Sequence, residues 1–202
     1  MSTDIILVSG LPRSGTSLMM QMLDNGGIEI VTDNIRVPDT DNPRGYYEFE
    51  KVKTIKRDTS WLPQTRGKAF KIISQLLYDL SPTEEYSIIF MERDMDEMLV
   101  SQEKMLKRLG RDAVPREEMK RSYSIHLQKL REWLRRQRHM KVLYVRYNDL
   151  VEHPEKHAAR VSEFLDGRVN AARMTETVDS RLYRNRKSRG ERSGDAIPEN
   201  AS

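Results

Sequence analysis

The stretch that decides the fold is Ser9-Gly10-Leu11-Pro12-Arg13-Ser14-Gly15-Thr16-Ser17, close to the N-terminus. It follows a short apolar run, residues 5–8, which is typical of a buried parallel strand. After it, apolar residues recur at helical spacing until residues 25–27 (Asn-Gly-Gly) end the helix. A strand, a glycine-containing turn and a helix in this order predict a loop that cradles an anion at the positive end of the helix.

The loop has the glycine spacing of the Walker pattern G-x-x-x-x-G-K-[ST], but it lacks the lysine of that pattern. Thr16 stands at the lysine position, and the cation is Arg13, inside the loop. In the Walker loop the lysine reaches the β- and γ-phosphates of a nucleoside triphosphate. We therefore expect an anion site whose ligand is not a magnesium triphosphate.

Length and charge limit the class of protein. The chain has 202 residues, which favours a single domain, expected over residues 1–180. A net charge of only +4 in a chain with 33% charged residues argues against a general polyanion binder, so no nucleic-acid partner is expected. The basic excess lies in residues 181–202, for which the sequence leaves three roles open: a disordered tail, a local contact with nucleic acid, or a cover over an anionic ligand.

Composition also bears on the compartment and on metals. Cysteine is absent, which excludes disulfides and thiolate metal sites and fits a reducing compartment. The four histidines have no metal-binding spacing, so no metal site is expected. Because no run has membrane-spanning length and the N-terminus lacks a signal-peptide pattern, we expect a cytoplasmic protein without a membrane partner.

The rest of the chain alternates between strand and helix patterns. Further strands are expected over residues 28–31, 69–73, 87–91 and 141–145, and helices over 45–57, 94–110, 116–139 and 154–165. This alternation predicts an α/β fold of the P-loop type, with three layers: a central parallel sheet flanked by helices on both faces. Ligands of such sheets bind beyond the C-terminal ends of the strands. That rule selects residues 10–17, Asp33, Ser74, Arg93 and Tyr147.

A second anion site is expected at Arg93, which follows a strand, together with Ser101 in the next helix. Residues 94 and 101 are two helical turns apart, so Ser101 lies on the same face as the start of that helix. A guanidinium fork and a hydroxyl there could clamp a phosphate monoester. The alternative is an arginine that pairs with Asp94 or Glu97 beside a serine that only packs.

These motifs together resemble the sulfotransferases that use 3′-phosphoadenosine 5′-phosphosulfate (PAPS). Residues 10–17 resemble their 5′-phosphosulfate loop, and Arg93 with Ser101 matches their element for the 3′-phosphate of the donor. Residues 147–155, followed by Phe164-Leu165, are similar to the Y-E-D-L-x-x-x-P segment of the family. The resemblance runs from about residue 5 to residue 166.

The resemblance implies a PAPS-dependent transfer of a sulfuryl group to a hydroxyl or amine of a small molecule or peptide, without a metal. Arg13 would hold the bridging and 5′-phosphate oxygens of the donor, and Lys71, which resembles the lysine of the K-T-H-L-P segment, would contact the sulfuryl group. A lysine on a surface edge is an equally good interpretation of Lys71. The implied donor-binding residues are Pro12, Arg13, Ser14, Gly15, Thr16, Ser17, Arg93, Ser101 and Tyr183.

The chain departs from the family in two places. Family members that act on phenols and steroids use a histidine base, but residues 1–125 contain no histidine, so a carboxylate is expected instead. Asp33, at a predicted strand end, is narrowly preferred over Glu48, and a helix cap or a surface charge is the alternative role for each. Residues 186–195 are only partly similar to the R-K-G-x-x-G-D-W-K loop of the family.

Two other functions compete with sulfuryl transfer. A small-molecule kinase of the P-loop class would need magnesium and ATP, and the absent lysine argues against it. A non-catalytic protein that binds 3′-phosphorylated nucleotides would keep the donor site without an acceptor site. The acceptor itself is not predicted, because such pockets are built from variable loops, here residues 34–66.

Overall fold

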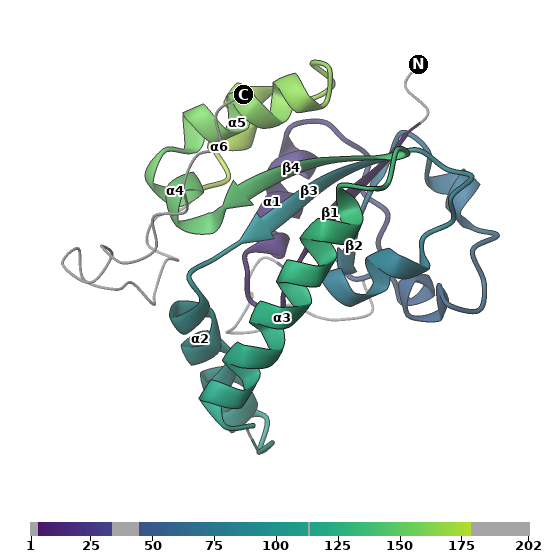
Figure 1. Ribbon diagram of the computed structural model, residues 1–202. Coiled ribbons are helices and arrows are strands. Elements are labelled where there is room, and N and C mark those ends of the chain that lie inside the picture. Colours follow the sequence, from purple (N-terminus) through teal and green to yellow (C-terminus); the bar gives the residue numbers. More distant parts are fainter. Residues whose placement is uncertain (1–3, 34–44, 113, 179–202) are drawn as a thin grey trace.

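The centre of the fold is a sheet of four parallel strands, which run side by side in Figure 1. The structure, a computed structural model, describes residues 4–33, 45–112 and 114–178. The strands lie in the order β2-β1-β3-β4, and their bounds are β1 (Ile5–Gly10), β2 (Ala69–Ile73), β3 (Tyr86–Glu92) and β4 (Met140–Arg146). In register, Gly10 lies between Ile73 of β2 and Met91 of β3, so the loop after β1 starts between two strand ends.

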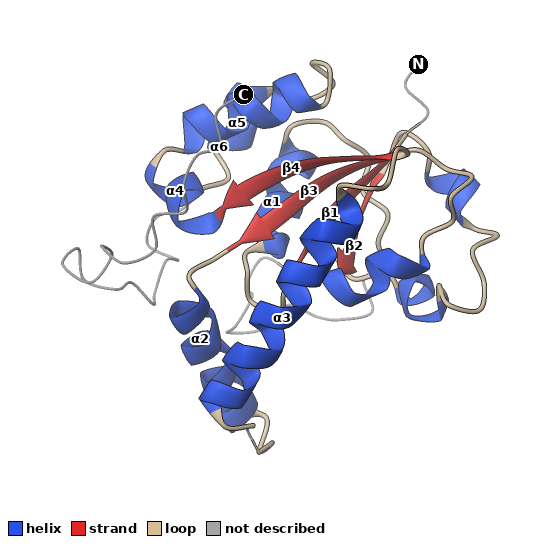
Figure 2. Cartoon of the chain, viewed as in Figure 1, coloured by secondary structure: helices blue, strands red, loops and turns tan. Residues whose placement is uncertain are grey.

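Helices cover both faces of the sheet, as Figure 2 shows. Alternate β1 residues contribute to two separate cores, Ile6 and Val8 to one, Ile5 and Leu7 to the other. The first core is closed by α1 (Thr16–Asn25), α4 (Tyr147–Glu152), α5 (Pro154–Phe164) and α6 (Ala171–Thr175). The second is closed by α3 (Arg116–Leu134) and the short 3-10 helices Glu50–Thr54, Leu62–Thr65 and Ser74–Asp79. The predicted three-layer α/β fold is confirmed.

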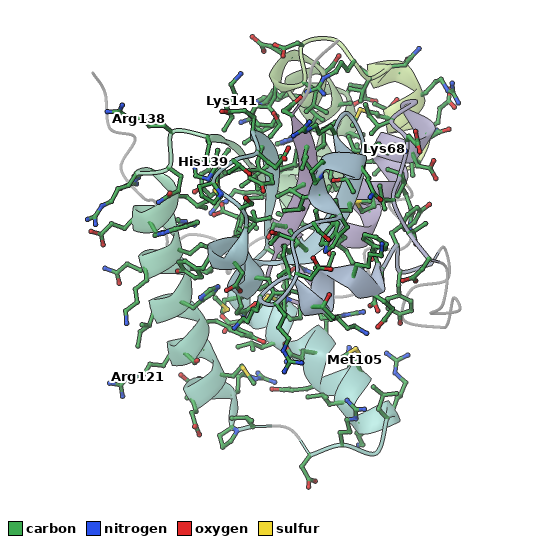
Figure 3. The ribbon with its side chains drawn as sticks, turned by 90° about the vertical axis from the view of Figure 1, so that its right-hand side faces the viewer. Lys68, Met105, Arg121, Arg138, His139 and Lys141 are labelled. Carbon is green, nitrogen blue, oxygen red and sulfur yellow. The ribbon has the colours of Figure 1, made fainter. Side chains whose placement is uncertain are left out.

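Helix α2 (Met95–Arg108) and the first half of α3 extend past the C-terminal ends of the strands. In Figure 3, Lys68 and Lys141, at the starts of β2 and β4, lie towards one end, and Met105 and Arg121 towards the other. A small cluster of Leu11, Met98 and Leu99, with Leu127 of α3 packed on it, joins these helices to the loop after β1.

The sequence predictions were wrong at three elements. Residues 28–31 form only an isolated bridge, in which Ile30 pairs with Ala69 at the edge of the sheet, because this short segment alternates weakly and exposes Glu29. The helix expected over 45–57 is reduced to the 3-10 turn Glu50–Thr54, and α3 ends at Leu134 rather than at residue 139. The other expected strands are present.

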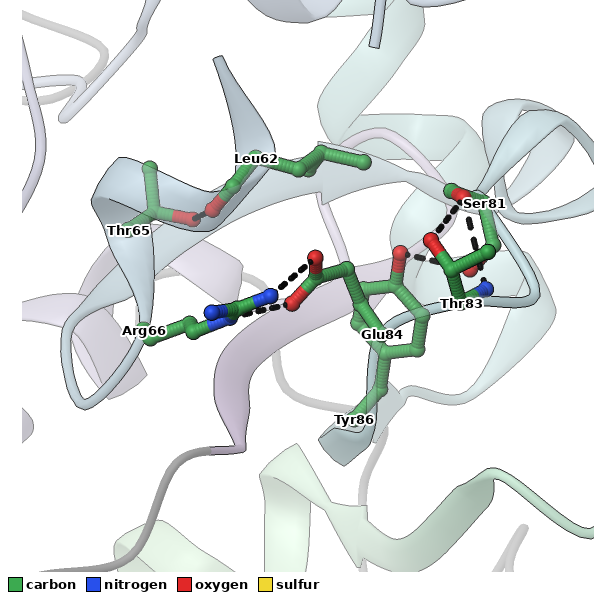
Figure 4. A network of polar contacts seen from close by, with 7 residues as sticks. All are labelled: Leu62, Thr65, Arg66, Ser81, Thr83, Glu84 and Tyr86. Atoms are coloured by element: carbon green, nitrogen blue, oxygen red, sulfur yellow. Dashed lines mark hydrogen bonds and ion pairs between the residues drawn. The ribbon is translucent and has the colours of Figure 1, made fainter. Parts of the chain in front are cut away.

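A polar network lies at the end of the sheet where β2 and β3 begin, as Figure 4 shows. Glu84, just ahead of β3 and 6% exposed, accepts hydrogen bonds from Nε and a terminal nitrogen of Arg66 at 2.7 and 2.8 Å. Tyr86 donates from its hydroxyl to the carbonyl of Ser81 at 3.0 Å, and burial raises the pKa of this phenol. These contacts satisfy polar groups that would otherwise be costly to bury.

The basic segment 181–202, including Tyr183, lies outside the described residues, so its expected role and the domain limit at residue 180 stay predictions. Within the described ranges, no helix is both long and apolar enough to cross a membrane.

Candidate functional site

The loop between β1 and α1 is tightly folded, and two glycines make this possible. A Cβ on Gly10 would lie 2.6 Å from the carbonyl oxygen of Met91, and one on Gly15 would lie 2.3 Å from the ring of Tyr147. Gly15 also has a φ of 100°, and Arg13 adopts a φ of 68°, in the left-handed region that few side chains tolerate. The backbone therefore turns sharply and leads directly into the first turn of α1, whose amides have no partner inside the helix.

The hydroxyl of Ser14 is buried inside this loop. The residue is 1% exposed, and its Oγ has no hydrogen-bond partner among the described residues. Buried hydroxyls are rarely left unsatisfied, and those that are need an explanation such as a bound group. A polar ligand at the start of α1 would meet this hydroxyl together with the helix amides. Pro12, Thr16 and Ser17 are partly exposed beside it.

The two predicted anion sites are joined by Arg13. Its Nε donates a hydrogen bond to Oγ of Ser101 at 3.1 Å, although the residues are 88 positions apart. Arg93 in turn donates from a terminal nitrogen to the backbone carbonyl of Arg13 at 3.2 Å. The structure thus brings the loop, the end of β3 and the second turn of α2 together, as the strand-end rule predicted.

Arg93 has further partners at the β4–α4 junction. Its Nε lies 3.5 Å from a carboxylate oxygen of Glu97, and its guanidinium carbon lies 4.7 Å from the centre of the Tyr147 ring. Pairing with Glu97 was the predicted alternative to phosphate binding, and the structure shows this pair. Burial raises the pKa of the Tyr147 phenol, and the nearby Arg93 and Arg13 cations oppose that shift only in part. Tyr147 is therefore a neutral aromatic surface at neutral pH.

The two candidate bases lie next to each other. The Asp33 amide donates to the Glu48 carbonyl at 3.3 Å, and the Asp33 carboxylate accepts from the Glu50 amide at 2.6 Å. This second bond gives a partner to the first amide of the 3-10 turn Glu50–Thr54, which is a structural role for the Asp33 carboxylate. Both carboxylate side chains are partly buried.

Lys71 lies in β2 and is turned towards the same segment. Its Nζ donates to the carbonyl of Tyr46 and lies 6.0 Å from the centre of that ring. The structure therefore groups Lys71 with the segment that holds Glu48.

One contact was missed by the sequence prediction. His126 of α3 places Nε2 at 2.9 Å from Oγ of Ser74, which is buried just after β2. Burial lowers the pKa of His126, so the imidazole is neutral at neutral pH and can accept a proton. No sequence signal could have paired them, because 52 positions separate the residues and only the packing of α3 joins them.

Metal-ligating groups do not cluster in the part of the chain that the structure describes: no three His, Cys, Asp or Glu side chains there are placed to hold an ion.

Comparison with known proteins gives a family match across nearly the whole chain. The model of the sulfotransferase domain family matches residues 2–199. No curated protein sequence matches the chain.

Solved structures resemble the chain at low sequence identity. A mouse sulfotransferase, SULT7A1, complexed with PAP, is 15% identical over 93% of this chain and 68% of that chain, with a TM-score of 0.52. A sulfotransferase from Alicyclobacillus acidocaldarius is 15% identical over 85% of this chain and 83% of that chain, with a TM-score of 0.48. A sulfotransferase domain from the curacin biosynthetic pathway is 14% identical over 81% of this chain and 74% of that chain, with a TM-score of 0.48. At such identities the likeness to the mouse structure concerns the fold alone.

Proposed function

The chain belongs to the sulfotransferase family, and we propose that it transfers a sulfuryl group from PAPS to a hydroxyl or amine of a small molecule or peptide. The observation that carries this proposal is the hydrogen bond from Arg13 to Ser101, which brings the two predicted anion-binding elements together and so supports one site for a doubly phosphorylated nucleotide. The mouse relative was solved with PAP, and we extend that class of ligand to this chain.

In this proposal the loop holds the 5′ end of the donor. The first amides of α1 and the Ser14 hydroxyl would bind the 5′-phosphosulfate oxygens, which explains why that hydroxyl is buried without a partner among the described residues. The acceptor oxygen attacks sulfur while the bond from sulfur to the bridging oxygen breaks, and negative charge develops on the departing phosphate. Arg13 would stabilise this charge from a fixed position.

The other proposed roles lie on either side of that loop. Ser101 and Arg93 would bind the 3′-phosphate, and Lys71 would contact the sulfuryl group on the acceptor side. The proton released by the acceptor would pass to Asp33 or Glu48, which the hydrogen bond from the Asp33 amide to the Glu48 carbonyl keeps in one segment.

The test is transfer of labelled sulfuryl from PAPS to a panel of hydroxylated and amino acceptors, with and without EDTA. We expect turnover that persists in EDTA, since neither the donor nor these residues require a metal. Binding of ATP in the presence of magnesium, with no PAPS-dependent product from any acceptor, would instead support the kinase alternative. Tight binding of adenosine 3′,5′-bisphosphate without turnover on the whole panel would support the non-catalytic alternative.

Two finer points belong to the same proposal. The absence of cysteine supports a cytoplasmic location. Residues 181–202 either cover the bound donor or form an unstructured tail. Deletion of these residues should weaken the binding of adenosine 3′,5′-bisphosphate only if they cover the donor.

A further inference from the structure

Arg93 is held by groups that the proposed chemistry does not use. On one side lies the carboxylate of Glu97, 3.5 Å from the arginine Nε, with only 4% of the Glu97 side chain and 8% of the Arg93 side chain exposed. Against the guanidinium lies the ring of Tyr147. The same ring fills the space in which a side chain on Gly15 would stand, so it contacts the loop as well.

Asn148 connects this carboxylate to the end of β4. Its Nδ2 donates to Oε2 of Glu97 at 3.0 Å, and its Oδ1 accepts from the amide of Asp94 at 3.5 Å. Asp94 in turn caps α2 by accepting from the amide of Glu97 at 3.0 Å. The start of α2, which carries Glu97, is therefore fixed to the β4–α4 junction by one amide side chain.

A carboxylate beside Arg93 is a disadvantage if the site serves only to attract anions, because it cancels much of the arginine charge. It is an advantage if the site must hold the guanidinium in one orientation. A long, flexible side chain that is fixed before binding loses less freedom when its ligand arrives, and it favours an anion in one place over the same anion elsewhere. Glu97 thus lowers the affinity of the Arg93 site for any phosphate, and it increases the preference of that site for a phosphate in one position over a phosphate in another.

We propose that Glu97 and Asn148 are positioning residues that make the Arg93 site select a 3′-phosphate over a 2′-phosphate on the same adenosine. This inference rests on the proposed function, because it assumes that Arg93 faces the ribose phosphate of the donor. The two isomers carry the same charge, so they can be separated only by where the groups that meet the phosphate stand, the Arg93 guanidinium among them.

The experiment is calorimetric titration of adenosine 3′,5′-bisphosphate, adenosine 2′,5′-bisphosphate and AMP into the wild type and into Asn148→Ala and Glu97→Gln. We expect the wild type to prefer the 3′,5′ isomer by about tenfold or more, the factor that a charged hydrogen bond contributes. Asn148→Ala should reduce this preference to about threefold or less. Glu97→Gln should also reduce it, but through tighter binding of the 2′,5′ isomer, because the repelling charge is gone. AMP affinity should change by less than about threefold in both variants.

A double variant, Asn148→Asp with Glu97→Gln, tests the contact itself. It reverses donor and acceptor in the 3.0 Å hydrogen bond and keeps the net charge of the pair, so it should recover part of the isomer preference. The matched control is Glu84→Gln, which removes another buried carboxylate bonded to an arginine, at the other end of β3 (Figure 4). This control should lose stability and keep the preference.

Three outcomes overturn the inference. Unchanged isomer preference in Asn148→Ala and Glu97→Gln would overturn it while the proposed function stands. A parallel loss of AMP binding and bisphosphate binding would show a structural role only. A wild type that binds AMP as tightly as the 3′,5′-bisphosphate would overturn the donor proposal as well.

Discussion

The side chain of Arg13 crosses from the β1–α1 loop to α2, where its Nε donates a 3.1 Å hydrogen bond to Oγ of Ser101. In the opposite direction, Arg93 donates to the backbone carbonyl of Arg13. These two contacts link the two predicted anion sites in both directions. A ligand that attracts Arg13 towards the loop would therefore also act on Ser101.

We expect Arg13→Ala to lower the rate of sulfuryl transfer by about 10²–10³, the loss typical when a positioned charge at a transition state is removed. Arg13→Lys keeps the charge but loses the planar fork that reaches Ser101, so an intermediate rate is expected. Steady-state kinetics with PAPS and any accepted substrate measure the rates of both variants. Near-normal turnover in a folded Arg13→Ala protein would contradict the role given to this residue.

The sequence predicted this part of the molecule well because its signals are local. The spacing of Gly10 and Gly15, the apolar run before them and the strand end at Arg93 each follow from neighbouring residues, and parallel strands place their C-terminal ends at one edge. The contacts that depend on packing between distant segments were not predictable. The hydrogen bond between His126 and Ser74 and the amide of Asn148 on Glu97 arise only when α3 and β4 pack against the sheet. The segment 28–31 pairs with β2 only through Ile30 and Ala69, and the weak local pattern did not show that the pairing would stop there.

Gly15→Ala should destabilise the fold and weaken nucleotide binding, because a methyl group there would overlap the ring of Tyr147. Gly27→Ala is the matched control: Gly27 has the same φ of 100° but nothing within 4 Å of the added Cβ. The control should cost about 1–2 kcal/mol from backbone strain alone. Gly15→Ala should cost about 1–3 kcal/mol more, the usual range for overpacking.

Urea unfolding of both glycine variants and titration with adenosine 3′,5′-bisphosphate measure these effects. Equal losses of stability and unchanged nucleotide binding in the two variants would show that the close contact between Gly15 and Tyr147 contributes neither to stability nor to nucleotide binding.

Activity should depend on a carboxylate, with Asp33→Asn more harmful than Glu48→Gln. Asparagine keeps an acceptor oxygen for the Glu50 amide, so Asp33→Asn should leave the 3-10 turn folded while it removes the base. The structure supplies a third group for comparison, His126, whose lowered pKa leaves it able to accept a proton. Single-turnover rates with saturating donor should compare Asp33→Asn, Glu48→Gln and His126→Ala.

A protein inactivated only by His126→Ala would contradict the carboxylate assignment. The matched control for loss of packing is His126→Asn, a smaller polar side chain that does not act as a base in this pH range. If His126 only packs against Tyr78 and Ser74, the two histidine variants should differ in stability rather than in pH dependence.

Stability should fall on mild acidification because of His157. This side chain is 5% exposed, and its Nδ1 has no hydrogen-bond partner among the described residues. Burial lowers its pKa, the Arg160 and Lys156 cations and His153 lower it further, and Asp149 opposes them. As the pH falls below about 6.5, the unfolded chain binds a proton that the folded protein still resists, so the free energy of unfolding decreases.

Chemical denaturation between pH 7.5 and pH 5 should show this decrease in the wild type, and a smaller decrease in His157→Gln. Part of the decrease should remain in that variant, because burial also lowers the pKa of His126. Identical slopes with pH in the wild type and in His157→Gln would exclude His157 as a source of the effect.

Ser101→Ala should reduce the preference for adenosine 3′,5′-bisphosphate over AMP, and it is a cleaner probe than Arg93→Ala. Arg93 donates to the Arg13 carbonyl, so removing it also loosens the loop and should weaken AMP binding. Ser101 accepts a hydrogen bond from the side chain of Arg13 and not from its backbone. A neutral hydroxyl contributes about 0.5–1.5 kcal/mol, which corresponds to a loss of about 2- to 13-fold in bisphosphate affinity. The control is Ser124→Ala in α3, an exposed serine whose hydroxyl donates only to the carbonyl of Lys120 at 2.8 Å. Calorimetry with both nucleotides decides the matter: if Ser101→Ala binds them with the wild-type ratio, the serine only supports Arg13 and the 3′-phosphate is bound elsewhere.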